Sequence, residues 1–154
     1  MEKDVKSMTD AAALAPSRTS HRFRRLAGTG LVATLAAMVA ATLAAALART
    51  LGVDFEIPDG GAAIPLPGFA VVTGCFSLVG VVIAAALLRW SARPAERFVR
   101  TTVSLTAVSL VPPFLSGADA ATVTALLGVH LVAATVMIPT LARSLRSGLP
   151  HDAA

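Results

Sequence analysis

The sequence has few charged residues, few aromatic residues and one cysteine. Asp, Glu, Lys and Arg make up 14% of the 154 residues, whereas a soluble domain has about 25%. So few charges cannot cover the surface of a soluble domain of this length. With 55% hydrophobic residues and a mean hydropathy of +0.74, the composition predicts a membrane protein.

The scarcity of reactive side chains excludes several classes of membrane enzyme. The single cysteine, Cys75, permits no intramolecular disulfide, and a quinone-linked thiol oxidoreductase needs paired cysteines. A b-type haem normally needs two histidines within the membrane, but His130 is alone in the apolar stretches. The chain also has no paired aspartates, no glycine-rich phosphate loop and no metal-ligand cluster. We therefore expect no catalysis, no cofactor and no metal ion.

The excess of basic residues indicates a membrane surface rather than nucleic acid. The net charge is +4 and the pI is near 10.6. The basic residues flank apolar stretches and have few aromatic neighbours. This pattern predicts contact with the bilayer, with anionic lipid headgroups at the cytoplasmic face, and no nucleic-acid partner.

Four apolar stretches predict four transmembrane helices. The first has 23 residues without a charge, and a helix of that length reaches roughly 34 Å, against a hydrocarbon core of about 30 Å. We expect an all-α, four-helix transmembrane bundle over residues 26–142. Its expected spans are about 26–48, 69–88, 95–115 and 120–142.

Prolines and an aspartate mark the ends of the later helices. Pro94 suits the first turn of the third helix, and Pro112-Pro113 should end or kink it. Asp119 is a suitable N-cap for the fourth helix. Pro139 should bend the last turn of that helix.

The positions of the positive residues predict the topology. Twelve of the thirteen Lys and Arg residues lie in the tails 1–25 and 143–154 or in the segment from Arg89 to Arg100, and Arg49 is the exception. Positive residues stay in the cytoplasm, so we expect an up-down-up-down bundle with both termini cytoplasmic. The tail 1–25 should be disordered or loosely helical.

A cleaved secretory signal is the competing interpretation of the first helix. A basic stretch precedes the apolar run, and Ala46-Leu47-Ala48 matches an A-x-A cleavage pattern. The apolar run is longer than the 7 to 15 residues or so of a signal core, so we expect an intact helix.

The connection after the first helix alternates acidic and apolar residues. Asp54 and Glu56 alternate with Val53, Phe55 and Ile57. In an extended chain the carboxylates would share one face while the apolar side chains rest on the bundle. Solvated loop carboxylates are favoured here over a cation site.

Small residues should allow the helices to pack closely. Lipid removes most of the hydrophobic drive between helices, so close backbone approach matters more. The first helix has two such stripes, so two of its faces allow close backbone approach: Ala33, Ala37, Ala41 and Ala45, and Ala36, Ala40, Ala44 and Ala48. The second helix repeats the pattern at Ala70 and Gly74, then at Gly80 and Ala84.

His130 is the ionisable side chain nearest the middle of a span, where a polar group usually faces the bundle interior. Aligning the helices by their ends brings four residues within its reach: Ser77, Cys75, Thr106 and Ser109. Two roles remain open: a neutral histidine hydrogen-bonded within the core, or a proton-handling or ligand-binding group.

Two segments carry a resemblance to a known family. The run from His130 to Val132, followed by Met137-Ile138-Pro139-Thr140-Leu141-Ala142-Arg143, resembles the closing helix of an actinobacterial family of small four-span membrane proteins without an assigned function. Leu51-Gly52-Val53-Asp54, which follows the first helix, also resembles that family. The resemblance covers about residues 25–146 in outline. It implies the four-span architecture and a bacterial inner membrane, and it supplies no catalytic residue.

These observations favour an integral membrane protein with a structural or interaction role and no catalysis. A homo-oligomer or a partner membrane protein would fit that role. The alternative is a small transporter or proton-linked carrier with its polar site around His130.

Overall fold

The computed structural model describes residues 16–56 and 63–147, and the side chains from residue 20 onward. The described residues form helices and one isolated bridge, between Glu56 and Ala63. The helices are α2 (Pro16–Thr50), α3 (Leu66–Trp90), α4 (Pro94–Ser109), α5 (Val111–Leu115) and α6 (Ala120–Arg146). The expected all-α fold is confirmed for these residues.

Four helical segments are long and apolar enough to cross a membrane: Ser20–Thr50, Leu66–Trp90, Pro94–Leu115, which joins α4 and α5, and Ala120–Arg146. Their outward surfaces carry many exposed Leu, Val and Phe side chains. A bilayer covers such surfaces, whereas water would not. The chain is therefore a multi-pass membrane protein.

The helices extend past their apolar stretches into the flanking arginines. α2 begins at Pro16, ten residues before the expected span, so residues 16–25 are helical rather than a loose tail. Residues 1–15 lie outside the described part of the chain. α3 ends one residue after Arg89, and α6 ends at Arg146. Arginine is a good helix former, and its long side chain reaches the headgroups while its backbone stays helical.

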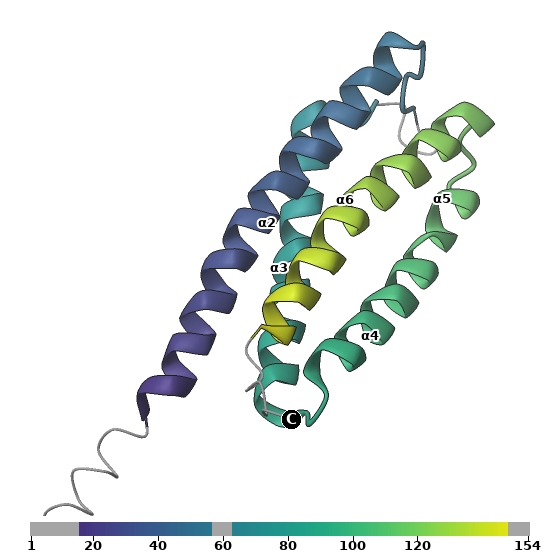
Figure 1. Ribbon diagram of the computed structural model, residues 1–154. Helices are drawn as coiled ribbons and strands as arrows, with labels where there is room; N and C mark the ends of the chain where they lie inside the picture. Colours follow the sequence, from purple (N-terminus) through teal and green to yellow (C-terminus); the bar gives the residue numbers. More distant parts are fainter. Residues whose placement is uncertain (1–15, 57–62, 148–154) are drawn as a thin grey trace, which may run out of the picture.

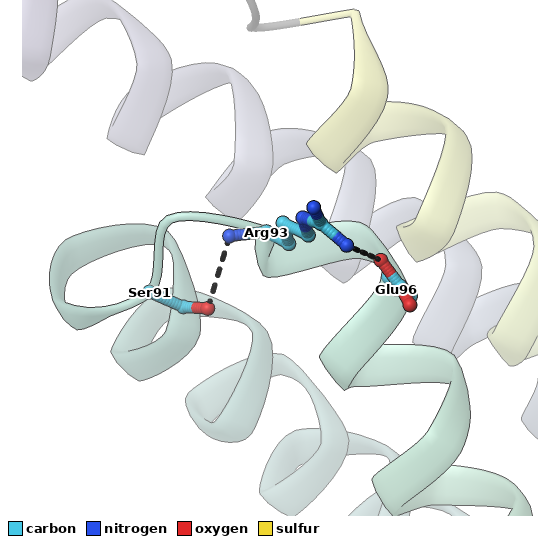
Figure 2. Close-up of polar contacts among 3 residues, drawn as sticks. All are labelled: Ser91, Arg93 and Glu96. Carbon is cyan, nitrogen blue, oxygen red and sulfur yellow. Dashed lines mark hydrogen bonds and ion pairs between the residues drawn. The ribbon is translucent and has the colours of Figure 1, made fainter.

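The connection from α3 to α4 is short and polar. The backbone N–H of Arg93 donates to the Ser91 hydroxyl at 3.2 Å, and the Arg93 guanidinium lies 3.6 Å from the Glu96 carboxylate (Figure 2). Both charged side chains are exposed, so this pair contributes little to stability. Pro94 stands in the first turn of α4, as predicted.

A break separates α4 from α5 at Leu110. Pro112 and Pro113 have no N–H to donate to the carbonyls one turn before them, so the regular helix ends there. The expected interruption of the third span is confirmed, with the break at Leu110 and both prolines in the short helix α5 that follows it.

Asp119 caps α6. Its carboxylate accepts hydrogen bonds from the backbone N–H groups of Ala121 and Thr122, at 3.2 and 3.1 Å. Hydrogen bonding from the side chain and backbone of Thr122 lowers the pKa of Asp119, so the cap is charged at neutral pH. The predicted N-cap is confirmed.

The helices form a bundle in which α6 lies between α2 and α4 (Figure 1). α2 packs most extensively against α6 and α3, and α4 packs against the same two helices. We call the end with the α3–α4 connection and the last turn of α6 the α3–α4 end. The other end, where α2 finishes and α3 begins, is the α2–α3 end.

The core has two clusters, one toward each end. The cluster of the α3–α4 end joins residues 26–37 of α2 to the later turns of α3 and α6 and to the start of α4. It holds Leu26, Ala33, Ala37, Ala84, Ala95, Phe98, Met137, Leu141, Ala142 and Leu145. The cluster of the α2–α3 end holds Ala41, Ala45, Phe55, Phe69 and Val129. α4 and α5 add no buried residue to this second cluster.

One alanine stripe of α2 packs and the other faces outward or sits at the margin. Ala33 is 2% exposed, and the next three residues of its stripe have no exposed surface. In the other stripe, Ala36 is exposed and its companions are half-buried. Close approach to α3 also uses glycine: a Cβ on Gly30 would lie 2.8 Å from a methyl carbon of Val81.

Enlarging a packed alanine should therefore destabilise the bundle. Ala41→Leu should lower the free energy of unfolding by about 1–3 kcal/mol, because the side chain has no space between α2 and its neighbours. Ala36→Leu, on the exposed stripe of the same helix, should change it by less than about 0.5 kcal/mol. Thermal unfolding of the two purified variants in detergent checks this. Equal stability would mean that the stripe is not a packing face.

The connection from α2 to α3 is held against the bundle. The Arg49 guanidinium donates to the carbonyl of Ile64, which gives the one arginine of this end a structural role. Phe55 is fully buried and meets Phe69 edge to face, with ring centroids 4.9 Å apart. Its φ of +55° departs from the expected extended chain. Asp54 and Glu56 are exposed, and Ile57 lies outside the described residues.

Candidate functional site

A polar pair joins α6 to α4 within the spans. Nε2 of His130 lies 2.7 Å from the Ser109 hydroxyl oxygen, and both side chains are half-buried. The same hydroxyl lies 2.8 Å from the carbonyl oxygen of Thr106, one turn earlier in α4.

The direction of the bond between Ser109 and His130 depends on the tautomer of the histidine. A serine hydroxyl has one proton and two acceptor lone pairs, and the Thr106 carbonyl can only accept. When Ser109 donates to that carbonyl, its oxygen is left to accept from Nε2–H of His130. A neutral histidine with its proton on Nε2 fits this arrangement. With the proton on Nδ1 instead, the Ser109 hydroxyl donates to Nε2 and the Thr106 carbonyl keeps the N–H of Leu110.

The pair lies at the break between α4 and α5. Ser109 is the last residue of α4, and the Thr106 carbonyl that it contacts also accepts from the N–H of Leu110 at 3.1 Å. His130 thus contacts α4 where the prolines interrupt it. The arrangement ties the interrupted helix to α6.

The structure brings together part of the predicted site. Ser109 meets His130 directly, and Thr106 takes part through its carbonyl. Ser77 is buried in α3 but makes no hydrogen bond with His130 in the described part of the chain. Cys75 is exposed, so it faces away from the core.

Pro139 lies inside α6 rather than in its last turn, because the helix continues to Arg146. It removes the backbone bond to the carbonyl of Thr135. The Thr135 hydroxyl donates to the carbonyl of Val132 at 2.8 Å. α6 stays one helix across the proline.

Several other hydroxyls of the spans bond to their own helix. Thr42, Thr102, Thr124 and Thr140 each donate to a carbonyl four residues earlier, at 2.6–2.8 Å. Such bonds satisfy a hydroxyl without a partner helix or water. Within residues 16–56 and 63–147, no group of three or more His, Cys, Asp or Glu residues could hold a metal ion.

Two adjoining cavities at the α3–α4 end were not predicted. One of about 170 Å³ is lined by His21, Arg22, Arg25, Leu26, Leu88, Ser144 and Ser147. The other, of about 220 Å³, is lined by Arg22, Phe23, Leu88 and Arg89. In the sequence, these arginines indicate the topology of the spans. No pattern in it shows that serines at the end of α6 come to lie beside the arginines of α2.

Comparison with known proteins gives a family and no characterised relative. No curated protein and no solved structure matches the chain. A family model described as a family of unknown function (DUF6069) matches residues 21–147. These residues include nearly all of the helices described above, and the expectation of a family without an assigned function is confirmed. The chain therefore belongs to the family of unknown function DUF6069.

Proposed function

We propose that the protein is a structural or interaction component of a bacterial plasma membrane, without catalytic activity. Its four spans alternate in direction, with both termini in the cytoplasm. The arginine-rich α3–α4 end supports this orientation, since positive residues are retained on the cytoplasmic side.

The proposal rests on the exposure of polar side chains on α4. The span formed by α4 and α5 is the least apolar of the four and has the smallest share of buried residues. In a membrane protein the more polar helix normally faces protein, because lipid offers no partners for its polar groups. α4 instead exposes Thr101 and Ser104 beside Val103, Leu105 and Val108. A second protein that packs on α4 would shield these polar side chains from lipid.

The packing of the bundle supports an interaction role over transport. The core is tightly packed between α2 and its neighbours, where Ala37, Ala41 and Ala45 have no exposed surface. His130 and Ser109 satisfy each other, and neither lines the two cavities described above. The second candidate, a small proton-linked carrier, rests on this histidine pair alone.

Photo-cross-linking tests whether protein covers α4. In a Cys75→Ser background, Ser104→Cys is labelled with a benzophenone maleimide and irradiated in native membranes. Leu35→Cys, on an exposed position near the middle of α2, is the matched control. We expect Ser104→Cys to give a covalent protein adduct and Leu35→Cys to react with lipid only.

The mass of the adduct identifies the partner. An adduct of twice the monomer mass indicates a second copy of this chain, and any other discrete mass indicates a partner membrane protein. If Ser104→Cys reacts with lipid alone, as Leu35→Cys does, α4 faces the bilayer and the interaction role is wrong.

A further inference from the structure

Two residues that line the cavity of about 170 Å³ at the α3–α4 end each have a polar atom without a hydrogen-bond partner. Nε of Arg22 and the hydroxyl oxygen of Ser144 are both buried, and neither is paired within the described residues. Both residues line this cavity. Thr34 also has a buried, unpaired hydroxyl, but it lines neither cavity. Buried polar atoms in proteins nearly always have a partner, so two of them on residues that line one cavity point to a ligand toward which their side chains turn.

The surroundings of the cavity are strongly positive. Arg25 and His21 line it with Arg22, and Arg89 lines the adjoining cavity. Among the described residues, Glu96 is the one carboxylate at this end of the bundle. It is exposed on the first turn of α4 and pairs with Arg93 (Figure 2). No described carboxylate is thus placed to neutralise the arginines of the cavity.

The donors define the chemistry of the ligand. Guanidinium groups have only donors, and they match an anion with several oxygens in a fixed arrangement, as a phosphate group has. A serine hydroxyl adds a further donor. The volume is sufficient, since a cavity of about 150 Å³ holds a molecule of benzene.

The apolar walls place this ligand at the membrane boundary. Leu26 and Leu88 line the cavity beside the arginines, at the start of the apolar stretch of α2 and near the end of that of α3. A site with cations on one side and leucines on the other suits an amphiphile with a negatively charged headgroup. Basic pockets between transmembrane helices bind anionic lipid headgroups in this manner.

We propose that the cavity lined by Arg22, Arg25 and Ser144 is a binding site for a phosphate group, either of an anionic phospholipid or free in solution. Rotation of the Arg22 and Ser144 side chains toward the cavity lets Arg22 Nε–H and the Ser144 hydroxyl donate to phosphate oxygens, and Arg25 supplies a second positive charge. The site is independent of the interaction surface proposed on α4.

Ligand-dependent thermal stability tests the site. The full chain, purified in a zwitterionic detergent, is titrated separately with phosphatidylglycerol, phosphatidylcholine and inorganic phosphate. We expect phosphatidylglycerol to raise the Tm of the wild-type chain, because a ligand that binds only the folded state stabilises it. Arg22→Gln and Ser144→Ala should each raise the half-maximal concentration at least tenfold, since each loses a donor to a charged group.

Arg24→Gln is the matched control, because Arg24 is exposed on the same helix and lines neither cavity. It should change the half-maximal concentration less than twofold. If Arg22→Gln does not fold, Ser144→Ala still tests the site, because it removes one hydroxyl and no charge.

The remaining outcomes distinguish a lipid phosphate from a free phosphate, and they include the results that would overturn the proposal. Stabilisation by inorganic phosphate, with the same loss in Ser144→Ala, supports the site and identifies a soluble ligand. Equal stabilisation by phosphatidylcholine and phosphatidylglycerol would overturn the proposal, as would equal losses in Arg24→Gln and Arg22→Gln. Asp152→Asn is measured alongside, because that carboxylate lies outside the described residues. A response seen only in Asp152→Asn would mean that the chain fills its own cavity, and the proposal would be wrong.

Discussion

Phe55→Ala should lower the free energy of unfolding by about 3–5 kcal/mol, the usual cost of removing a buried phenylalanine. Phe55 has no exposed surface and packs in the cluster of the α2–α3 end with Ala41, Ala45 and Val129. Its ring also meets Phe69 edge to face, a contact that adds about 0.5–1.5 kcal/mol beyond the buried area. Thermal unfolding in detergent measures the loss.

The backbone at this position provides a sharper version of the test. Phe55 has a φ of +55°, in the left-handed region. A residue with a Cβ costs about 1–2 kcal/mol there, whereas glycine has no such steric cost. Phe55→Gly should therefore be more stable than Phe55→Ala by about 1 kcal/mol, although it has one carbon fewer. Phe76→Ala, at a 66% exposed position of α3, should cost little. If Phe76→Ala is as destabilising as Phe55→Ala, the cluster is not what holds this connection.

His130→Lys should insert or fold poorly, because a fixed charge at the middle of a span costs about 2.5–3.5 kcal/mol on insertion scales. The lysine ammonium has three donors to satisfy, whereas the structure places one hydroxyl, that of Ser109, against His130. We expect a lower yield in the membrane fraction and a lower Tm than for the wild-type chain.

Two matched variants show whether water reaches the site. Leu131→Lys puts the same charge at the same depth on an exposed, lipid-facing position and should fail similarly. Thr124→Lys, exposed near the start of α6, should be tolerated because its side chain can reach the headgroups. If His130→Lys folds as well as the wild-type chain while Leu131→Lys fails, a water-filled site surrounds His130. The carrier interpretation would then replace the interaction role.

His130→Leu complements the lysine variant at the same site. It removes one hydrogen bond between helices, and such bonds average about 0.6 kcal/mol, so the Tm should be nearly unchanged. The Ser109 hydroxyl keeps the Thr106 carbonyl as its acceptor. If the protein handles protons instead, His130→Leu should abolish its pH dependence between about pH 5 and 8, without loss of stability.

The sequence by itself determined the features that depend on neighbouring residues. Length and apolar composition predict the four spans, since crossing a bilayer is a property of one helix at a time. Asp119 caps α6 because its carboxylate reaches the N–H groups two and three residues later. Pro112 and Pro113 interrupt the third span because they lack N–H groups. Helix ends were less predictable: arginines extend α2 and α6, although they end the apolar stretches.

Only the tertiary structure decided which residues of different helices meet. Each residue turns a helix by about 100°, and a helix that is apolar all round has no preferred inner face, so its rotation is set by packing. This packing buries the stripe of Ala37 and exposes Ala36, and it brings Ser109 to His130 while Cys75 faces outward. It also places Ser144 and Arg22, more than a hundred residues apart, at one cavity. Contacts of this kind depend on the positions of three helices together, and no local pattern encodes them.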